Sequence, residues 1–329
     1  GKSNFSDDDF ARVDCKTADK NTVLDCEIVA KINPPTTEEV SLLKPGTLFV
    51  SLLNSWDKEG PIKWLNEKKV TAFALEKIPR TSRAQSMDVL SSQANIAGYR
   101  AVLEASVHYK KFFPLMMTSA GMSKPAKVIV LGAGVAGLQA IATAKRLGAS
   151  VEAYDVRPEV KEQIQSLGAK FVELEVSESG QGTGGYAKEL SKEARELQQK
   201  LLTEYLKSAN IIISTANIPG RKAPVLITEA AVRGMKPGSV ILDLAAGTGG
   251  NCELTKADQT ISVGGVTVVG ISNYPSLVAT DSSQFFGNNL HNFLSIMIQK
   301  KEGQSVLKVD FEDDIIAAAC VCHQGQLRT

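Results

Sequence analysis

The chain has 329 residues, and its 43% hydrophobic and 22% charged residues are typical of a globular protein with about two domains. Lys and Arg number 37 against 36 Asp and Glu, and the resulting net charge of +1 provides no basic surface for nucleic acid or an anionic membrane. The five cysteines are odd in number and scattered, so we expect a reducing compartment, no disulfide framework and no metal site. Since the sequence has no initiating Met, we expect it to be a piece of a longer polypeptide.

The first third of the chain predicts a small α/β domain. Extended apolar runs at residues 25–32, 47–52 and 70–75 predict strands, and a long helical stretch is expected over 86–112. Residues 121–125 contain glycine and proline and predict a linker.

Beyond this linker, strands and helices alternate in the manner of a parallel sheet. Six strands are expected, at 127–131, 150–154, 170–174, 211–215, 239–244 and 267–271. Helices are expected at 138–147, 159–167, 187–207, 228–235 and from 282 to about 300. Two closing segments, 306–311 and 315–322, are assigned to the first domain, because six strands already complete a dinucleotide-binding sheet.

These patterns predict the α/β class, with two Rossmann-like domains that have parallel sheets and are joined by long helices. The first domain is expected to comprise residues 1–125 plus about 286–329, and the second residues 126–285. The apolar window 128–144 approaches the length of a membrane span, but its glycines favour a strand, a tight turn and a helix. We therefore expect no membrane span in this sequence.

A GxGxxG sequence follows one expected strand and opens a helix. Gly132 allows the tight turn, Gly134 lets the backbone approach a pyrophosphate, and Gly137 lets the helix pack closely on the strand. The next strand ends in Asp155, whose carboxylate can hold two ribose hydroxyls and would repel a 2′-phosphate. Arg157 could instead accept a 2′-phosphate, but because Asp155 stands at the strand tip we favour NAD(H) over NADP(H). The alternative is an α/β fold with a glycine turn and no ligand.

A dense polar cluster lies between residues 80 and 91. On a helix with about 100° per residue, Gln85, Asp88 and Ser91 fall within one arc of about 120°. Such a row could contact a carboxamide and a ribose. The alternative is a solvated helix face that begins with a capping box at Ser82 and Gln85.

A glycine-dense loop at residues 180–186 ends in Tyr186. Such a loop is either a simple linker or a lid whose tyrosine closes over a bound nucleotide. The sequence alone leaves both interpretations open.

The stretch from Arg80 to Arg100, RTSRAQSMDVLSSQANIAGYR, closely resembles the signature of one family. This family is the NAD(H)-binding component, domain I, of proton-translocating nicotinamide nucleotide transhydrogenase. The glycine turn is similar to the family's, and so are the segments 154–163, 185–188, 218–220 and 243–252. The likeness extends over nearly the whole chain.

This resemblance implies a two-domain, Rossmann-like protein that dimerises, with the family's opening strand–helix unit missing from this sequence. It implies that NADH bound here lies beside NADP⁺ on a partner domain, and that hydride passes directly between the two nicotinamides. The implied enzyme is a Si/Re-specific, proton-translocating NAD(P)⁺ transhydrogenase, in which a membrane proton-channel domain couples the transfer to proton movement. The chain would then lie on the aqueous face of a membrane, in the bacterial cytoplasm or the mitochondrial matrix or another organelle interior.

Matching positions imply which residues carry the reaction. The implied catalytic residues, around the nicotinamide and its ribose, are Arg80, Gln85, Asp88, Ser91 and, on a mobile loop, Tyr186. The implied cofactor-binding residues are Gly132, Gly134, Val135, Ala136, Gly137, Asp155, Val156, Arg157, Ala216 and Gly247. Hydride transfer between two nicotinamides breaks no O–H or N–H bond, so a site without a general acid or base suits it.

Alanine dehydrogenase shares this fold and much of the resemblance. Its reaction moves a proton as well as a hydride, so it needs a lysine and a histidine beside the keto acid. Lys31 could be that lysine, but no histidine precedes His108. A non-catalytic NAD sensor or scaffold is the third interpretation.

Overall fold

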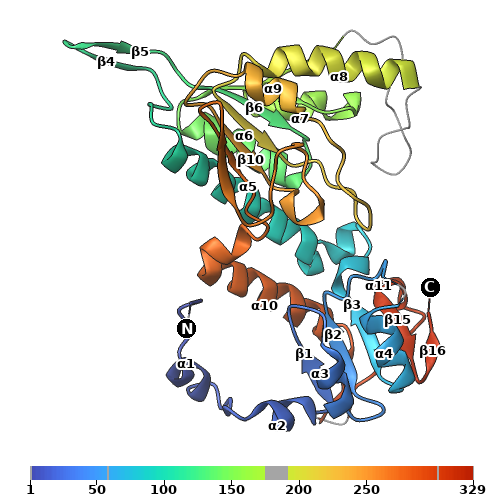
Figure 1. Ribbon diagram of the computed structural model, residues 1–329. Coiled ribbons are helices and arrows are strands. Elements are labelled where there is room, and N and C mark those ends of the chain that lie inside the picture. Colours follow the sequence, from blue (N-terminus) through green and yellow to red (C-terminus); the bar gives the residue numbers. More distant parts are fainter. Residues whose placement is uncertain (1, 58, 175–191, 302–303, 329) are drawn as a thin grey trace. The chain divides into compact units, whose positions relative to one another are not determined.

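A computed structural model describes residues 2–57, 59–174, 192–301 and 304–328 (Figure 1). The chain forms two compact units. Unit 1 comprises Gly1–Gln93 and Ala279–Thr329, and unit 2 comprises Ala94–Val278. Parallel strands and helices build both units, so the predicted α/β class with Rossmann-like sheets is confirmed.

Unit 1 contains a five-stranded sheet in the order β1, β2, β3, β15, β16. The first three strands are parallel, β15 is antiparallel to β3, and β16 is antiparallel to β15. The strands are β1 (Ile28–Ala30), β2 (Leu48–Ser51), β3 (Thr71–Ala74), β15 (Cys320–His323) and β16 (Gln326–Leu327). The other elements are α1 (Asp7–Ala11), α2 (Lys20–Leu24), α3 (Thr37–Leu42), α4 (Pro61–Glu67), η1 (Leu75–Lys77), η2 (Ser82–Met87), α10 (Ala279–Ser295), β13 (Ile298–Lys301), β14 (Gln304–Leu307) and α11 (Asp314–Ala319).

The last segment of unit 1 differs from the prediction. The helix expected to run to about residue 300 ends at Ser295, because Met297 is fully buried and the chain then turns into the β13–β14 hairpin. Residues 315–322 are not one segment but helix α11 followed by strand β15. Asp313 begins α11 by accepting hydrogen bonds from the N–H groups of Ile315 and Ile316 at 2.9 and 3.2 Å.

Unit 2 contains a seven-stranded sheet in the order β11, β12, β10, β9, β6, β7, β8. Six of these strands are parallel neighbours, as predicted, and β11 adds an antiparallel edge. The strands are β6 (Lys127–Leu131), β7 (Ser150–Tyr154), β8 (Lys170–Phe171), β9 (Ile211–Ser214), β10 (Val240–Asp243), β11 (Thr260–Val263) and β12 (Val266–Val269). Helix α5 (Val89–His108) begins in unit 1 and continues in unit 2 from Ala94. The other elements of unit 2 are β4 (Met116–Thr118), β5 (Gly121–Ser123), α6 (Val135–Arg146), η3 (Pro158–Val160), α7 (Lys161–Ser166), α8 (Lys192–Leu206), α9 (Glu229–Gly234), η4 (Ala246–Thr248) and η5 (Pro275–Val278).

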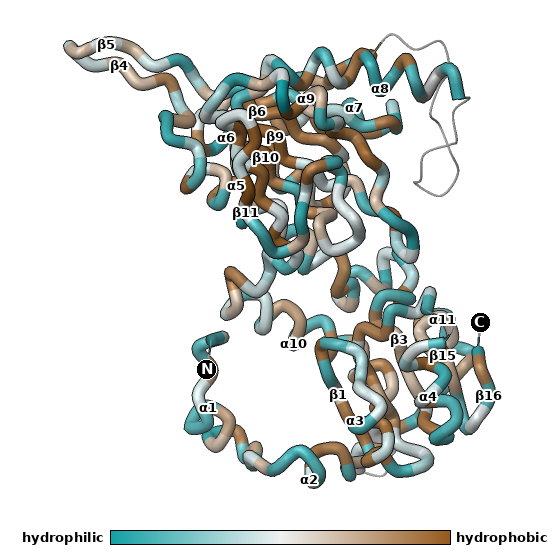
Figure 2. Tube along the Cα trace, viewed as in Figure 1, coloured by the Kyte–Doolittle hydropathy of each residue, from teal (hydrophilic) through white to brown (hydrophobic). Residues whose placement is uncertain are grey.

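Each face of this second sheet supports its own core. Val128 and Val130 point to the side covered by α5, α6 and α7, whereas Ile129 and Leu131 point to the side covered by α8 and α9. Alternate side chains of a strand face opposite sides, so a strand buried on both faces is apolar throughout. Figure 2 shows this hydrophobic concentration along β6, β9 and β10. None of the helices in the described ranges combines the length and apolar character that a bilayer span requires.

The segment predicted as a linker at residues 121–125 is partly a strand. β4 and β5 pair in an antiparallel hairpin that projects from unit 2 (Figure 1). Met117 and Met122 are 71% and 58% exposed, so the hairpin carries apolar side chains in water. The glycine that suggested a linker is used for a turn, since Gly121 has a φ of +137°.

Candidate functional site

The carboxyl ends of four neighbouring parallel strands in unit 2 lie level with one another. Leu131 of β6 pairs with Tyr154 of β7 and with Ser214 of β9, and Ser214 pairs with Asp243 of β10. The chain continues from β6 to β7 on one side and returns as β9 on the other, so the strand order reverses beside β6. Open α/β sheets bind ligands at this edge and at this reversal point. The loops after these four strands are therefore the candidate site of unit 2.

The glycine turn joins β6 to α6 with the geometry that its sequence predicts. Gly132 has a φ of +93°, and a Cβ on Gly137 would lie 1.9 Å from the Gly132 carbonyl oxygen, so both positions require glycine. Gly134 is the N-cap of α6, where, among the described residues, no side chain caps the helix and an added Cβ would meet no atom within 4 Å. Open space in front of an uncapped helix N-terminus is the arrangement that accepts a phosphate.

Asp155 follows β7 and reaches back to this turn. Its Oδ2 accepts a hydrogen bond from the Ala133 N–H at 2.7 Å, and its side chain is only 5% exposed. Arg157 binds the same carboxylate through Nε and Nη2, each at 3.0 Å, and this contact raises the pKa of the guanidinium. The structure thus brings Gly132, Asp155 and Arg157 together around the first turn of α6. Burial and the nearby Asp155 charge raise the pKa of Tyr154, so this phenol stays neutral.

The remaining predicted cofactor residues lie at the same edge or beside it. Val135 is the first residue of α6 and is 41% exposed, whereas Ala136 is half-buried. Val156 is half-buried on the face of the sheet that α8 and α9 cover. Ala216 follows β9, and Gly247 lies exposed in η4 after β10.

Two buried polar residues that the sequence analysis missed hold these loops. Oδ1 of Asn251 accepts from the Ala216 N–H at 3.1 Å, and its Nδ2 donates to the carbonyl oxygens of Ala216 and Pro224 at 2.7 and 2.8 Å. Asp243 accepts from the N–H groups of Asn251 and Cys252 at 2.7 and 3.0 Å. Both side chains belong to fully buried residues, so these bonds are made away from water. Asp243 and Asn251 are both polar residues of the 243–252 segment, and this was the sequence signal that could have identified them.

The polar segment of unit 1 does not form the single helical face that was predicted. Residues 82–87 form the 3₁₀ helix η2, Asp88 is extended with a ψ of 90°, and α5 begins at Val89. The capping box predicted at Ser82 and Gln85 is also wrong, since Thr81 stands at the N-cap and no side-chain cap bond forms. The arc expected for one continuous helix therefore does not apply to Gln85.

Asp88 and Ser91 are nevertheless brought together. Asp88 accepts from the Ser91 N–H at 2.9 Å and from the Ser91 hydroxyl at 2.6 Å, which is how an aspartate caps a helix N-terminus. Arg80 and Gln85 have exposed side chains on the segment before it. Asp88 ends one helix and begins the next because its carboxylate competes for backbone donors.

Helix α10 anchors this segment through another residue that the sequence analysis missed. Asn289, 7% exposed, donates from Nδ2 to the Ser86 carbonyl oxygen at 2.8 Å and accepts from the Ser92 hydroxyl at 2.7 Å. Asn292 donates to the same Ser86 oxygen at 3.1 Å. The residues on either side of Asp88 are therefore fixed by contacts across unit 1.

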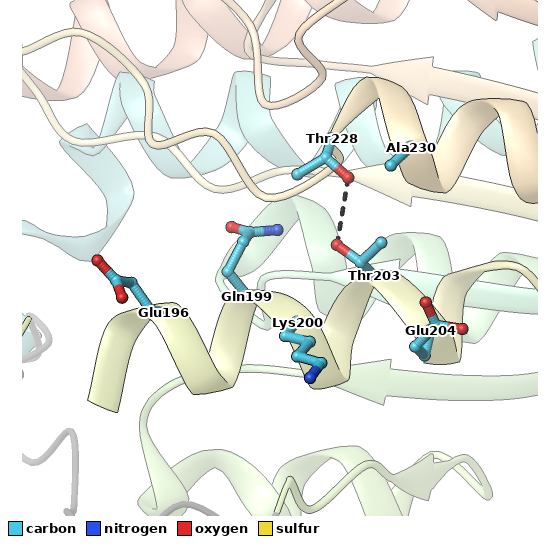
Figure 3. A pocket seen from close by; sticks show the side chains of 7 residues that line it. All are labelled: Glu196, Gln199, Lys200, Thr203, Glu204, Thr228 and Ala230. Atoms are coloured by element: carbon cyan, nitrogen blue, oxygen red, sulfur yellow. Dashed lines mark hydrogen bonds between the residues drawn. The ribbon is translucent and has the colours of Figure 1, made fainter. Parts of the chain in front are cut away.

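Tyr186 lies outside the described residues. A shallow open pocket lies between α8 and α9, and Figure 3 shows the side chains of Thr203 and Thr228 facing each other in it. Their hydroxyl oxygens lie 3.2 Å apart. None of the residues predicted to bind or react with a cofactor lines this pocket, whose residues are Glu196, Gln199, Lys200, Thr203, Glu204, Thr228 and Ala230.

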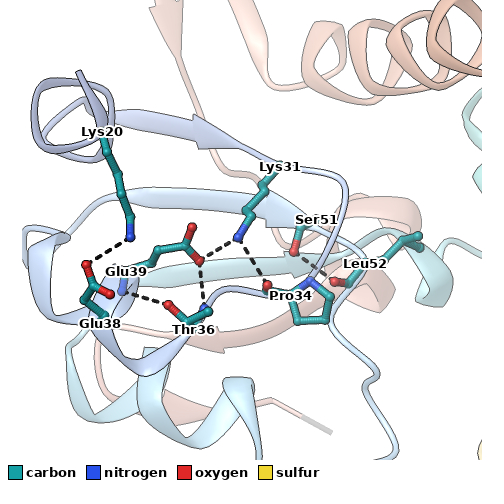
Figure 4. Close-up of polar contacts among 8 residues, drawn as sticks. All are labelled: Lys20, Lys31, Pro34, Thr36, Glu38, Glu39, Ser51 and Leu52. Carbon is teal, nitrogen blue, oxygen red and sulfur yellow. Dashed lines mark hydrogen bonds and ion pairs between the residues drawn. The ribbon is translucent and has the colours of Figure 1, made fainter. Parts of the chain in front are cut away.

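Lys31, the lysine considered for an amino-acid dehydrogenase, is held in an ion pair. Its Nζ lies 2.6 Å from the Glu39 carboxylate and 3.4 Å from the Pro34 carbonyl oxygen. Figure 4 shows both contacts. The lysine contact and the Thr36 N–H lower the pKa of Glu39, so the carboxylate remains charged beside the lysine. His323, which lies in strand β15 of the same sheet, makes a hydrogen bond with the Thr71 hydroxyl through Nδ1 at 2.9 Å.

The fold and the glycine turn define a class: a two-unit, Rossmann-like α/β protein with a turn of the dinucleotide-binding type. Residues 1–97 match the family described as alanine dehydrogenase/PNT, N-terminal domain, and residues 101–329 match its C-terminal domain. The chain belongs to the alanine dehydrogenase/PNT family.

Within this family the chain resembles transhydrogenase subunits more than alanine dehydrogenases. It is 45% identical over 99% of its length to NAD(P) transhydrogenase subunit alpha of Haemophilus influenzae, and it spans 63% of that protein. It is 46% identical over 92% of its length to an NAD(P) transhydrogenase subunit alpha chain of Rhodospirillum rubrum, covering 80% of it. A crystal structure of transhydrogenase from Sinorhizobium meliloti matches 99% of this chain and 88% of its own, with a TM-score of 0.88 and 39% identity. An alanine dehydrogenase of Halomonas elongata is more distant, at 29% identity.

Proposed function

We propose that this chain is the NAD(H)-binding component of a proton-translocating NAD(P)⁺ transhydrogenase. In this proposal it holds NADH while hydride passes directly to NADP⁺ on a separate domain. The observation that carries the proposal is the β6–α6 glycine turn bonded to Asp155 at 2.7 Å, in a chain 46% identical to a transhydrogenase subunit.

The residues at the edge of the unit 2 sheet fit a dinucleotide. The space in front of Gly134 leaves room for a pyrophosphate, and the uncapped N-terminus of α6 offers N–H donors to it. Asp155 supplies acceptors for the adenosine ribose at the end of the adjacent strand. In this role Ala216 and Gly247 border the cofactor from the loops after β9 and β10.

The polar residues of unit 1 are assigned to the nicotinamide half. Arg80, Gln85, Asp88 and Ser91 offer guanidinium, amide, carboxylate and hydroxyl groups, which can orient a carboxamide and a ribose. When bound, NADH supplies the hydride from its dihydronicotinamide ring, and the hydride transfer itself requires no proton transfer to or from these side chains. The work of these side chains is therefore to hold the ring at reacting distance and to keep water out. Tyr186 is assigned to the same ligand.

The proposal includes the rest of the complex. The partners are an NADP(H)-binding domain and a membrane proton-channel domain, with transfer of the Si/Re type, and this chain lies on the aqueous face in the bacterial cytoplasm or an organelle interior such as the mitochondrial matrix. A second copy of the chain completes a homodimer. The exposed methionines of the β4–β5 hairpin support this last point, because an isolated two-stranded hairpin is barely stable without a surface to pack on.

A hydride-transfer assay tests the proposal. The chain is mixed with an NADP(H)-loaded partner domain, and transfer to an NAD⁺ analogue is followed by absorbance. NADH deuterated on one face of C4 at a time then reports the stereochemistry. Turnover that needs the partner supports the proposal, whereas NADH binding without turnover would identify a sensor.

Alanine dehydrogenase is the competing function. Oxidation of NADH by pyruvate and ammonia without any partner would support it. The ion pair of Lys31 with Glu39 argues against it, since the ammonium is already held by a carboxylate at 2.6 Å. We therefore expect no such oxidation, and a Lys31→Met variant that transfers hydride at the normal rate.

A further inference from the structure

The Asp155 carboxylate has its acceptor positions filled by residues of its own unit. Oδ2 accepts from the Ala133 N–H at 2.7 Å and from Nη2 of Arg157 at 3.0 Å. Oδ1 accepts from the Arg157 N–H at 2.9 Å and from Nε of Arg157 at 3.0 Å. A carboxylate offers about four lone-pair positions, so these contacts leave none for a ribose diol.

These contacts differ in how easily they can be released. The N–H of Ala133 belongs to the glycine turn and that of Arg157 to the backbone after β7, and neither can leave without unfolding the edge of the sheet. The Arg157 guanidinium is on a flexible side chain that is 22% exposed, so it can swing away. The two hydroxyls of a ribose need two acceptor positions on the carboxylate. The guanidinium occupies two such positions on Asp155, so its departure frees the number required.

We propose that the Arg157 guanidinium competes with the adenosine ribose for Asp155, leaves the carboxylate when NAD(H) binds, and determines how far the site tolerates a 2′-phosphate. This inference rests on the proposed function, because it concerns the same cofactor site. It makes Arg157 a specificity-determining residue and not only a structural ion-pair partner.

The burial of the carboxylate explains why such a competitor is present. A carboxylate that is 5% exposed is costly to leave unpaired, and a bidentate guanidinium satisfies it when no ribose is there. Ligand binding then exchanges one set of donors for another. The exchange weakens NADH binding, since the ion pair must first be broken.

The Arg157 side chain should have the opposite effect on the binding of NADP(H). Asp155 alone would repel a 2′-phosphate, whereas a guanidinium released two residues away can pair with it. Removing Arg157 should therefore strengthen NADH binding and weaken NADPH binding. A purely structural ion pair would not separate the two ligands in this way.

Calorimetric titration of the full chain tests the inference. Wild type, Arg157→Ala and Arg157→Gln are each titrated with NADH and NADPH. The matched control is Lys161→Ala, which removes a nearby cation that pairs with the exposed Glu173. We expect NADH to bind both Arg157 variants about three- to tenfold more tightly and NADPH at least about threefold more weakly, with no change in the control. Titration with 5′-AMP and 2′,5′-ADP should repeat this pattern, which assigns the effect to the adenosine half.

The outcomes separate this inference from the proposed function. Wild-type protein that binds NADH, with Arg157 variants that bind it equally or more weakly, would overturn the inference and leave the proposed function intact. A folded wild-type protein that binds no NADH would overturn both. Circular dichroism of each variant shows whether it is folded, and Arg157→Gln keeps two of the three stem methylenes if Arg157→Ala loses stability.

Discussion

The glycine turn of unit 2 and the polar segment of unit 1 are built in different ways. The shape of the turn is determined by backbone geometry, since Gly132 needs a positive φ and a Cβ on Gly137 would clash with the Gly132 carbonyl oxygen. The polar segment is instead positioned by side-chain hydrogen bonds: Asp88 caps α5, and Asn289 of α10 bonds to Ser86 and Ser92. We therefore expect a clash in the turn to reduce both stability and NADH binding, whereas the loss of one side-chain contact in the polar segment should have a smaller and more selective effect.

The largest effect is expected from Gly137→Ala. Its Cβ would lie 1.9 Å from the Gly132 oxygen, so the turn must deform, and we expect a loss of about 3 kcal/mol in the free energy of unfolding together with the loss of NADH binding. Denaturant unfolding and calorimetry measure the two quantities.

Gly134→Ala is the matched control for this glycine. An added Cβ there meets no atom of the described part of the chain within 4 Å, so stability should stay within about 0.5 kcal/mol of wild type. NADH should nevertheless bind about tenfold more weakly, because the methyl group enters the space through which the pyrophosphate approaches. Equal stability of the two variants would contradict the backbone account of the turn.

Asp88→Asn tests the polar segment. We expect hydride transfer to the partner domain to slow by about tenfold or more, while the NADH Kd changes by less than about threefold, because the residue acts on ring placement. Stopped-flow transfer and equilibrium titration provide the two numbers. Asp19→Asn is the control, since Asp19 likewise caps a helix, α2, by accepting from the Thr22 N–H, and it is not one of the residues assigned to the cofactor. A parallel loss of rate and affinity in Asp88→Asn would argue against a positioning role.

Asn289→Ala should produce an intermediate effect. It removes two part-buried hydrogen bonds of a buried residue and leaves the Ser92 hydroxyl with only the Val89 carbonyl oxygen, at 3.0 Å, as an acceptor. We therefore expect a loss of about 1–3 kcal/mol in unfolding free energy and a several-fold slower transfer. NADH binding should be unchanged. Asn292→Ala, which removes an exposed donor to the same Ser86 oxygen, should have little effect on either quantity. If both variants behave alike, burial is not what makes the Asn289 contact important.

The smallest effect is expected at the ion pair of Lys31 and Glu39. The pKa of Glu39 is lowered from its ordinary 4.5, so the pair stabilises the folded protein above about pH 4.5 and this contribution is lost as pH falls through the folded pKa. Glu39→Gln should therefore cost about 0.5–1 kcal/mol at pH 7 and nothing in strong acid. Glu38→Gln, whose partner Lys20 is also exposed, is the control and should cost nothing measurable. A pH-independent loss in Glu39→Gln would contradict this account, because the Lys31 pair and the Thr36 N–H both favour the charged carboxylate.

Prediction from sequence succeeded where the requirement was local. The glycines at 132 and 137 and the carboxylate at 155 could be predicted because a strand, a tight turn and a helix leave little choice of residue. The long helix over 86–112 was wrong at both ends, since α5 begins at Val89 and ends at His108. At its start, apolar residues keep a helical spacing through Asp88, and only the cap geometry shows the break. The linker at 121–125 was wrong because a glycine turn within a short hairpin has the same composition as a flexible segment.

Contacts between distant regions of the chain could not be predicted in this way. Asn289 and Ser92 are 197 positions apart, and Asn251 and Ala216 are 35 apart, so no local pattern links them. The two guanidinium bonds to Asp155 are an intermediate case. Asp155 and Arg157 were both singled out in the sequence, but only the fold shows that the Arg157 guanidinium binds the Asp155 carboxylate.

By itself, the sequence determined the alternation of strands and helices, the glycine turn and the acid at the end of the next strand, because periodicity and backbone sterics act between near neighbours. Only the tertiary structure decided that Asp88 caps α5, that Asn251 and Asn289 hydrogen-bond to distant backbone groups, and that the Arg157 guanidinium binds the Asp155 carboxylate. Buried polar groups must find partners wherever the fold brings them, and this requirement is satisfied across the whole chain at once.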